Sequence, residues 1–388
     1  MKMLRRRQRF LGAALALLLG VLTGGISLFA SCGPFTDFTD AVFCQFVLEI
    51  FYLGITTGTT PTTYEPASPV SRLQMAAFLS RTVDAALRRG SRRASMGHFF
   101  SPTTTGALAI TTVGNSPQLL RSDGADVWVP NMNSNSVSRV RASDGRLLET
   151  WTGATKASGP LVALGRVIVT GFTSPGTPGN LFTIDPTQPA GSVATVASNL
   201  GSGPSGIAFD GSRVWTANVF EGVSIVTPGV SIPWTVTTVT AGFSQPKGAL
   251  YDGTNIWVTD QNASRLLKLN SAGGILQTVT VGATPLSPAF DGANIWVPSQ
   301  VGQSVTVVRA STGAVLGTLT GNGLAGPQSA AFDGERVLVA CLGGLSLWKA
   351  ADLTSLGSLP TFVNFYGSCS DGVDFWVSMN LTNQIARF

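Results

Sequence analysis

The sequence predicts an all-β protein, a seven-bladed β-propeller built from four-stranded repeats of about 40 residues, preceded by a small α-helical module. One observation is low charge: 12% of the 388 residues are charged and 45 are Gly, which argues against disorder and coiled coils. Another is an Asp-Gly motif, called the phrase below, that recurs along the chain. When Leu164-Gly165 is counted as one occurrence, the intervals between successive occurrences are 41, 46, 42, 39, 42 and 38 residues. The phrase begins at Asp123, Asp210, Asp252, Asp291, Asp333 and Asp371. The fifth residue after each Asp is Trp128, Trp215, Trp257, Trp296, Leu338 and Trp376.

Residues 1–31 have the layout of a bacterial secretory signal peptide. Five basic residues precede an uncharged run over residues 10–30, with small residues at its end. Cys32 then stands where a lipoprotein signal places its lipidated residue, and the alternative is an ordinary thiol beside a cleavage site. Because the run has about 21 residues, an uncleaved membrane anchor also stays open.

The charge balance excludes one class of partner. The formal net charge is +5, and five basic residues lie in the signal segment, so the remaining chain is formally neutral. We therefore expect no nucleic-acid partner, and contact with a membrane only through the signal anchor or a lipid.

The cysteines fall into two well-separated pairs, Cys32 with Cys44 and Cys341 with Cys369. In an exported chain an even number permits disulfides, and four cysteines allow three connectivities. Cys341 and Cys369 belong to adjacent repeats, so a bridge between them is one expectation. No CxxC spacing occurs and His98 is the single histidine, so we expect no metal site.

The sequence pattern of residues 32–87 predicts the small helical module. A first apolar helix face ends at Gly54, a residue suited to the C-terminal end of a helix. Ser71 is a suitable N-cap for a second helix, which carries Met75, Phe78 and Leu79. The first face is formed by Val42, Phe46, Ile50 and Leu53.

Three motifs follow one another in this module: Phe35-x-Asp37-Phe38, Leu53-Gly54-Ile55-Thr56-Thr57-Gly58 and Val70-Ser71-Arg72-Leu73-Gln74. Together they resemble an S-layer homology domain. Such domains bind cell-wall polymers through the Arg of the last motif, since a guanidinium holds a carboxylate by two hydrogen bonds. The resemblance implies that Arg72 and Gln74 bind cell-wall polysaccharide or peptidoglycan. Family anchors usually carry three copies and this chain carries one, so a packing role for Arg72 within the fold stays open.

Residues 88–103 predict a linker. Four arginines surround Gly and Ser over residues 88–93, a composition typical of a solvated connection. The alternative is a basic patch that touches anionic wall polymer or lipid headgroups.

Residues 104–388 predict the propeller. The unit that begins at residue 248 reads as four strands separated by an Asp-Gly turn and a Gly-rich turn. The last unit, residues 367–388, supplies three strands only. We expect its outer strand to come from residues 107–114, whose Val-Gly-x-x-Pro ending matches residues 281–285. This closure would leave no open sheet edge.

Four repeats carry an aromatic residue directly before the phrase Asp, and outer turns read Thr312-Gly313 and Asp144-Gly145. The aromatic residues are Phe209, Tyr251, Phe290 and Phe332. With the phrase, they resemble the YVTN and NHL-like bacterial β-propellers, including the streptogramin-lyase-like group, over about residues 106–388. The resemblance implies the architecture and leaves the function open.

The repeated Trp and Asp are interpreted as packing and turn residues, because they recur in every blade. A ligand site is expected where the repeats differ, eight residues after the phrase Asp. The candidates there are Asn131, Asn218, Asp260 and Ser299, on a propeller face able to bind a glycan or a peptide by hydrogen bonds. Loop polarity without a ligand is the alternative.

The sequence offers no catalytic constellation and no cofactor motif. Lyases of the streptogramin type use a catalytic His with metal-binding acids, whereas His98 lies in the linker before the first complete blade. No phosphate loop or nucleophile elbow occurs. We therefore expect a secreted, envelope-associated or cell-surface protein that binds or scaffolds. The alternative is an envelope lyase or hydrolase that uses Asp260.

Overall fold

The computed structural model describes residues 34–37, 43, 44, 47, 50, 51, 55–79, 82, 109–361 and 363–388. The chain divides into two compact units, Met1–Arg89 and Gly90–Phe388. The predicted signal segment 1–31, Cys32 and the linker 88–103 lie outside the described residues. Of the helices that are described, none is both long enough and apolar enough to cross a membrane.

The N-terminal unit has a small core around Phe35. This ring is fully buried, meets Phe51 edge-on with 5.2 Å between ring centroids, and lies 5.4 Å from the Tyr64 ring. The Asp37 carboxylate accepts backbone hydrogen bonds from Tyr64 and Glu65 at 2.9 and 2.7 Å, and these bonds hold its pKa below the ordinary value. The first predicted motif therefore builds the core of this unit.

Residues 72–79 form a helix, and further helical residues occur at 43, 44, 47, 50 and 51. Ser71 begins the helix as predicted: its hydroxyl accepts the N–H of Gln74 at 3.2 Å, and its own N–H donates to Gln74 Oε1 at 2.8 Å. This reciprocal pair is a capping box. Gln74 is thus occupied by the helix end, while Arg72 is exposed. The assignment of these short helices to an S-layer homology module stays a prediction.

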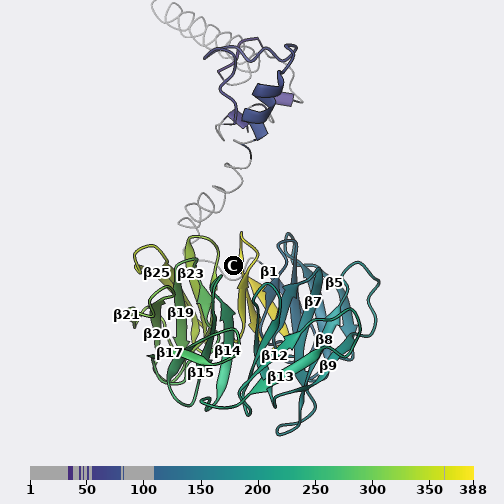
Figure 1. The fold of residues 1–388 in the computed structure, drawn as a ribbon. Coiled ribbons are helices and arrows are strands. Elements are labelled where there is room, and N and C mark those ends of the chain that lie inside the picture. The colour runs from purple at the N-terminus through teal and green to yellow at the C-terminus, as the bar shows by residue number, and fades with distance from the viewer. Residues whose placement is uncertain are drawn as a thin grey trace, which may run out of the picture. The chain divides into compact units, whose positions relative to one another are not determined.

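The described residues from 109 onward form seven four-stranded antiparallel sheets (Figure 1). The first sheet holds β2 (Arg121–Ser122), β3 (Asp126–Asn131), β4 (Ser136–Arg141) and β5 (Leu147–Thr152). The second holds β6 (Pro160–Ala163), β7 (Arg166–Phe172), β8 (Gly179–Ile184) and β9 (Ala194–Leu200). The third holds β10 (Pro204–Phe209), β11 (Val214–Asn218), β12 (Val223–Thr227) and β13 (Thr235–Val239). The fourth holds β14 (Pro246–Tyr251), β15 (Ile256–Asp260), β16 (Arg265–Leu269) and β17 (Ile275–Thr280).

The remaining sheets repeat this order. The fifth holds β18 (Ala289–Phe290), β19 (Asn294–Ser299), β20 (Ser304–Arg309) and β21 (Val315–Leu319). The sixth holds β22 (Pro327–Phe332), β23 (Arg336–Cys341), β24 (Gly344–Lys349) and β25 (Ser355–Pro360). The seventh runs β1 (Ala109–Thr112), β28 (Gln384–Arg387), β27 (Phe375–Met379) and β26 (Ser368–Ser370). The seven-bladed prediction is confirmed.

The seventh blade joins the two ends of the propeller. β1 pairs antiparallel with β28, from Ala109 opposite Arg387 to Thr112 opposite Gln384. In Figure 1, β1 lies beside the yellow C-terminal strands. The predicted outer strand from residues 107–114 is therefore confirmed.

Five of the six Asp-Gly motifs connect a turn to a buried Trp. Asp252 Oδ1 accepts the N–H groups of Thr254 and Asn255 at 2.8 and 2.6 Å, and its Oδ2 accepts the indole N–H of Trp257 at 2.7 Å. Gly253 has φ +93°, and a Cβ there would meet nothing within 4 Å, so backbone conformation alone requires glycine. The same Asp–Trp bond joins Asp123 to Trp128, Asp210 to Trp215, Asp291 to Trp296 and Asp371 to Trp376.

The phrase residues are therefore structural, as predicted. Trp257 is fully buried, like its four counterparts. Burial alone would raise the pKa of Asp210, but the bonds from Trp215 and the turn N–H groups outweigh it and lower that pKa to about 2. In the sixth blade, Leu338 replaces Trp, and the Arg336 guanidinium donates to Asp333 Oδ2 at 2.8 Å instead.

Apolar clusters fill the space between neighbouring blades, and they correct one prediction. Cys341 is a buried free thiol in the core between the fifth and sixth sheets. Cys369 is a buried free thiol in the core between the seventh and first sheets. The predicted Cys341–Cys369 disulfide is wrong, because the sixth sheet packs one face on each neighbour and the two thiols lie in different cores. Cys44, in the N-terminal unit, is disulfide-bonded.

Candidate functional site: the propeller channel

The predicted polar ring lies inside the fold. Asn131, Asn218, Asp260 and Ser299 all have 0% relative exposure. Each pairs with the Pro that leads into the innermost strand of its blade, for example Asn218 with Pro204. These side chains are buried rather than exposed on a face, because the second strand ends beneath the link from the preceding blade, and their role in ligand binding stays a prediction.

The Asp260 carboxylate is fully occupied by hydrogen bonds within the protein. Its Oδ1 accepts the N–H of Gln245 at 2.6 Å, and its Oδ2 accepts the N–H of Ser244 at 2.9 Å. Arg265 donates to the same Oδ2 at 2.7 Å and to the carbonyl of Gly242 at 2.6 Å. This carboxylate fixes the link between the third and fourth blades.

The other members of the ring pack against a glycine of the same link. A Cβ on Gly201 would come within 2.5 Å of Asn218 Nδ2, and a Cβ on Gly282 within 2.7 Å of Ser299. Asn218 donates to Ser224 at 2.9 Å. These close approaches explain the repeated Gly in the Val-Gly-x-x-Pro motif, since any other residue would push the link off the sheet.

The exposed side chains at this end of the propeller come two residues after the ring position in the sequence. Phe220, Val301 and Leu381 have relative exposures of 55%, 68% and 74%. They occupy loop tips between the second and third strands of their blades. The outer surface at this end is therefore partly apolar rather than a ring of amides and carboxylates.

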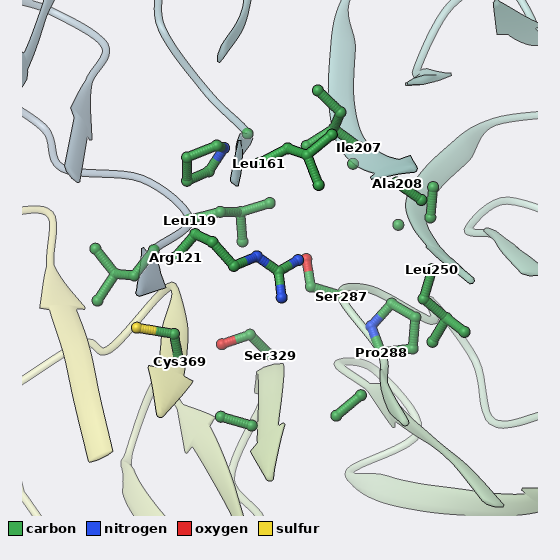
Figure 2. A pocket seen from close by; sticks show the side chains of 18 of the residues that line it. Leu119, Arg121, Leu161, Ile207, Ala208, Leu250, Ser287, Pro288, Ser329 and Cys369 are labelled. Carbon is green, nitrogen blue, oxygen red and sulfur yellow. The ribbon is translucent and has the colours of Figure 1, made fainter. Parts of the chain in front are cut away.

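The innermost strands of all seven blades enclose a channel of about 500 Å³. Every blade contributes residues just before its Asp-Gly turn, so the channel follows the axis of the ring (Figure 2). A space of this size falls within the range of small-molecule sites, roughly 300–1,000 Å³.

Arg121 carries the one charge among the lining residues. It stands two residues before the phrase Asp, on β2, and Figure 2 shows its side chain extending into the channel with the guanidinium end toward Ser287. The equivalent residues of the other blades are Val162, Ala208, Leu250, Ala289, Ala331 and Cys369. The sequence comparison that singled out the polar ring could have found Arg121, had it been applied at this position.

The Arg121 guanidinium has no hydrogen bond or ion pair within the described residues. It is open to the channel, yet protein surrounds it, and burial lowers its pKa from the ordinary value. An arginine remains charged near neutral pH even so. The channel therefore holds a cation without a counter-charge in its wall.

The rest of the channel wall is unevenly polar. The third to sixth blades contribute an aromatic ring directly before the turn, whereas the first and seventh contribute Ser122 and Ser370. Ser287 adds a hydroxyl group to the lining, whereas the Ser329 hydroxyl is buried and donates to the carbonyl of Tyr366 at 2.9 Å. The aromatic rings are Phe209, Tyr251, Phe290 and Phe332. The phrase carboxylates face their Trp indoles instead of the channel.

Within the described parts of the chain, no group of three or more His, Cys, Asp or Glu residues is placed to hold a metal ion. The channel offers one guanidinium, several hydroxyls and apolar walls. Such a set can bind and orient a ligand by charge, hydrogen bonding and packing.

Fold and channel together define a seven-bladed β-propeller with a lined central cavity. Virginiamycin B lyase from Staphylococcus aureus is similar in structure, with a TM-score of 0.58 at 16% identity, over 72% of this chain and 97% of that one. A catalytically inactive variant of that lyase with quinupristin gives 0.58 at 14%, over 72% and 98%. The WD40 β-propeller domain of Doa1 gives 0.59 at 12%, over 73% and 96%. No protein-family model matches the sequence, and no curated protein does. At these identities, the likeness shows the fold alone.

Proposed function

We propose that this chain is an exported binding or scaffolding protein of the bacterial cell envelope. In this proposal, the N-terminal unit attaches it to cell-wall polysaccharide or peptidoglycan, and the propeller holds a protein or glycan ligand. The observation that supports binding most directly is the channel, where the repeats diverge in chemistry around a space of about 500 Å³.

The proposed attachment rests on Arg72 and its surroundings. Arg72 is exposed on the first turn of the helix 72–79, next to the capping box of Ser71 and Gln74. An exposed guanidinium on a fixed helix start is available to a wall carboxylate. Gln74 contributes by holding that helix start in place.

Co-sedimentation of the full chain with purified cell-wall sacculi tests the attachment. Arg72→Ala should weaken retention about tenfold or more, since a charge-assisted pair is lost. Gln74→Glu preserves the capping box and should retain binding. Arg309→Ala, a change of an exposed propeller arginine, is the matched control. Equal retention of the Arg72→Ala variant and the wild type would remove Arg72 from the proposal, and no retention of the wild type would end the anchoring role.

An envelope lyase or hydrolase is the second candidate, favoured by the fold likeness to the lyase of Staphylococcus aureus. Incubation of the purified chain with quinupristin, followed by mass spectrometry, tests it. Under the binding proposal, the compound is recovered unchanged. Consumption of quinupristin would favour the enzyme hypothesis over the binding hypothesis.

A further inference from the structure

We infer that the propeller channel is a binding site for a small organic carboxylate, with Arg121 as the group that holds the carboxylate. The inference rests on the propeller having a binding role and is independent of wall attachment. It names the chemistry of a ligand that neither the repeat pattern nor the fold likeness specifies.

The charge of the channel favours an anion. Arg121 is the single charged residue among the described residues that line it, and its guanidinium has no partner within them. Arg121 is exposed to the channel and has no counter-ion in its wall, so an entering anion gains from pairing with it. A planar guanidinium offers two parallel N–H groups to a carboxylate.

The count of charges favours a single carboxylate over a phosphate. Phosphate sites in proteins gather several donors or cations around a group that carries more than one negative charge. This channel provides one cation, and its other polar side chains are hydroxyls such as those of Ser287 and Ser122. One negative charge matches one guanidinium.

The residues that line the channel favour a ligand with an apolar or ring-shaped part. Leu119 lines the channel near Arg121, and Leu250 and Pro288 lie across the channel from it (Figure 2). The third to sixth blades each contribute an aromatic residue to the lining, and these rings also pack against the cores between blades. A ligand with a carboxylate at one end and a ring at the other would satisfy both the guanidinium and the apolar lining.

The arginine is available for this role because the fold does not use it. Its counterparts include Ala208, Ala289 and Ala331, so six other blades close without any group that resembles a guanidinium. The side chain is exposed to the channel and forms no hydrogen bond or ion pair within the described residues, so it contributes little to the stability of the fold. Replacing Arg121 should therefore leave the propeller folded.

Calorimetric titration of the full chain tests the inference. The probes are benzoate and D-glucuronate, with benzamide and inorganic phosphate as comparisons. We expect saturable binding of at least one carboxylate and no binding of benzamide. R121M should weaken that binding about 10- to 100-fold, the range for loss of a charged hydrogen-bonded pair. The affinity of R121K for the carboxylate should lie between those of the wild type and R121M, because Lys keeps the charge and loses the two-pronged geometry.

R309M, which changes an exposed arginine at the end of β20, is the matched control and should bind like the wild type. Thermal unfolding without ligand should show all three variants folded. An unchanged Kd in R121M, binding of phosphate as tight as that of the carboxylates, or no binding of either carboxylate would each overturn the inference. Co-sedimentation with sacculi is a separate measurement. A failure of wall attachment would leave the carboxylate titration unaffected, and a failure of carboxylate binding would leave the wall-attachment result unaffected.

Discussion

Cys341 and Cys369 are buried thiols with no disulfide, and burial is the dominant influence on their chemistry. Burial disfavours the charged thiolate, so it raises the pKa of each thiol from 9.0 to about 12. Arg121 pulls the pKa of Cys369 in the opposite direction, but burial prevails. Neither thiol should be nucleophilic in the folded protein.

The stability of the propeller should therefore fall as pH rises between about 9 and 12. Above pH 9 the unfolded chain loses thiol protons that the folded chain keeps, so rising pH favours unfolding. Urea denaturation across this range measures the effect, and a Cys341→Ala, Cys369→Ala double variant should show a shallower slope. Ellman's reagent should react with the wild-type thiols only after unfolding. Equal slopes, or rapid labelling of the folded chain, would contradict the prediction.

At the scale of single elements, the link between blades depends on the residue that ends the second strand. Pro246 pairs with Asp260, and Asp260 binds two backbone N–H groups and Arg265. The same position holds Asn in the first and third blades and Ser in the fifth. One geometric requirement, a small polar side chain beneath a Gly-containing link, is thus met by different residues.

Asp260→Ala should destabilise the propeller by about 3–5 kcal/mol, because it removes the counter-charge of Arg265 and the acceptor of two backbone N–H groups. Urea denaturation measures the change in unfolding free energy. Asp144→Ala is the control: its ion pair with Arg141 is exposed, and its removal should have a much smaller effect. A small effect of Asp260→Ala on stability would show that this carboxylate is not a structural residue.

The whole ring depends on one strand from the other end of the propeller sequence. β1 pairs with β28 over four residues, and Val113 N–H donates to the Asn383 carbonyl at 2.9 Å. Without β1, β28 would present an unpaired edge, and such edges pair with other chains. β1 is the outer strand of its sheet, as β5 is in the first blade, so it completes the seventh blade and joins the two ends of the ring.

A truncation that removes residues 1–114 should melt about 10 °C lower than one that removes residues 1–103. Several backbone hydrogen bonds at about 0.5–1.5 kcal/mol each are lost with β1, and each kcal/mol shifts the melting temperature by about 2–4 °C in a domain of this size. Thermal scans and size-exclusion chromatography measure stability and aggregation. Matching melting temperatures would show that closure by β1 contributes little.

The sequence by itself determined the architecture of the propeller. Asp-Gly fixes a turn, the Trp five residues later fills the space between sheets, and both recur because every blade meets the same neighbours. The missing strand of the last repeat and its match in residues 107–114 even determined how the ring closes. Local turn chemistry and repetition are enough for these features, since each repeats the same short-range contacts.

Only the tertiary structure decided which polar residues are free. Asn131, Asn218, Asp260 and Ser299 vary between blades as binding residues would, yet they are buried beneath the links. Arg121 varies at a less conspicuous position and faces the channel. The physical reason is that exposure depends on what the preceding blade places over a strand end, and seven innermost strands must meet before a channel exists. The separate cores that keep Cys341 from Cys369 arise in the same way, from packing between blades.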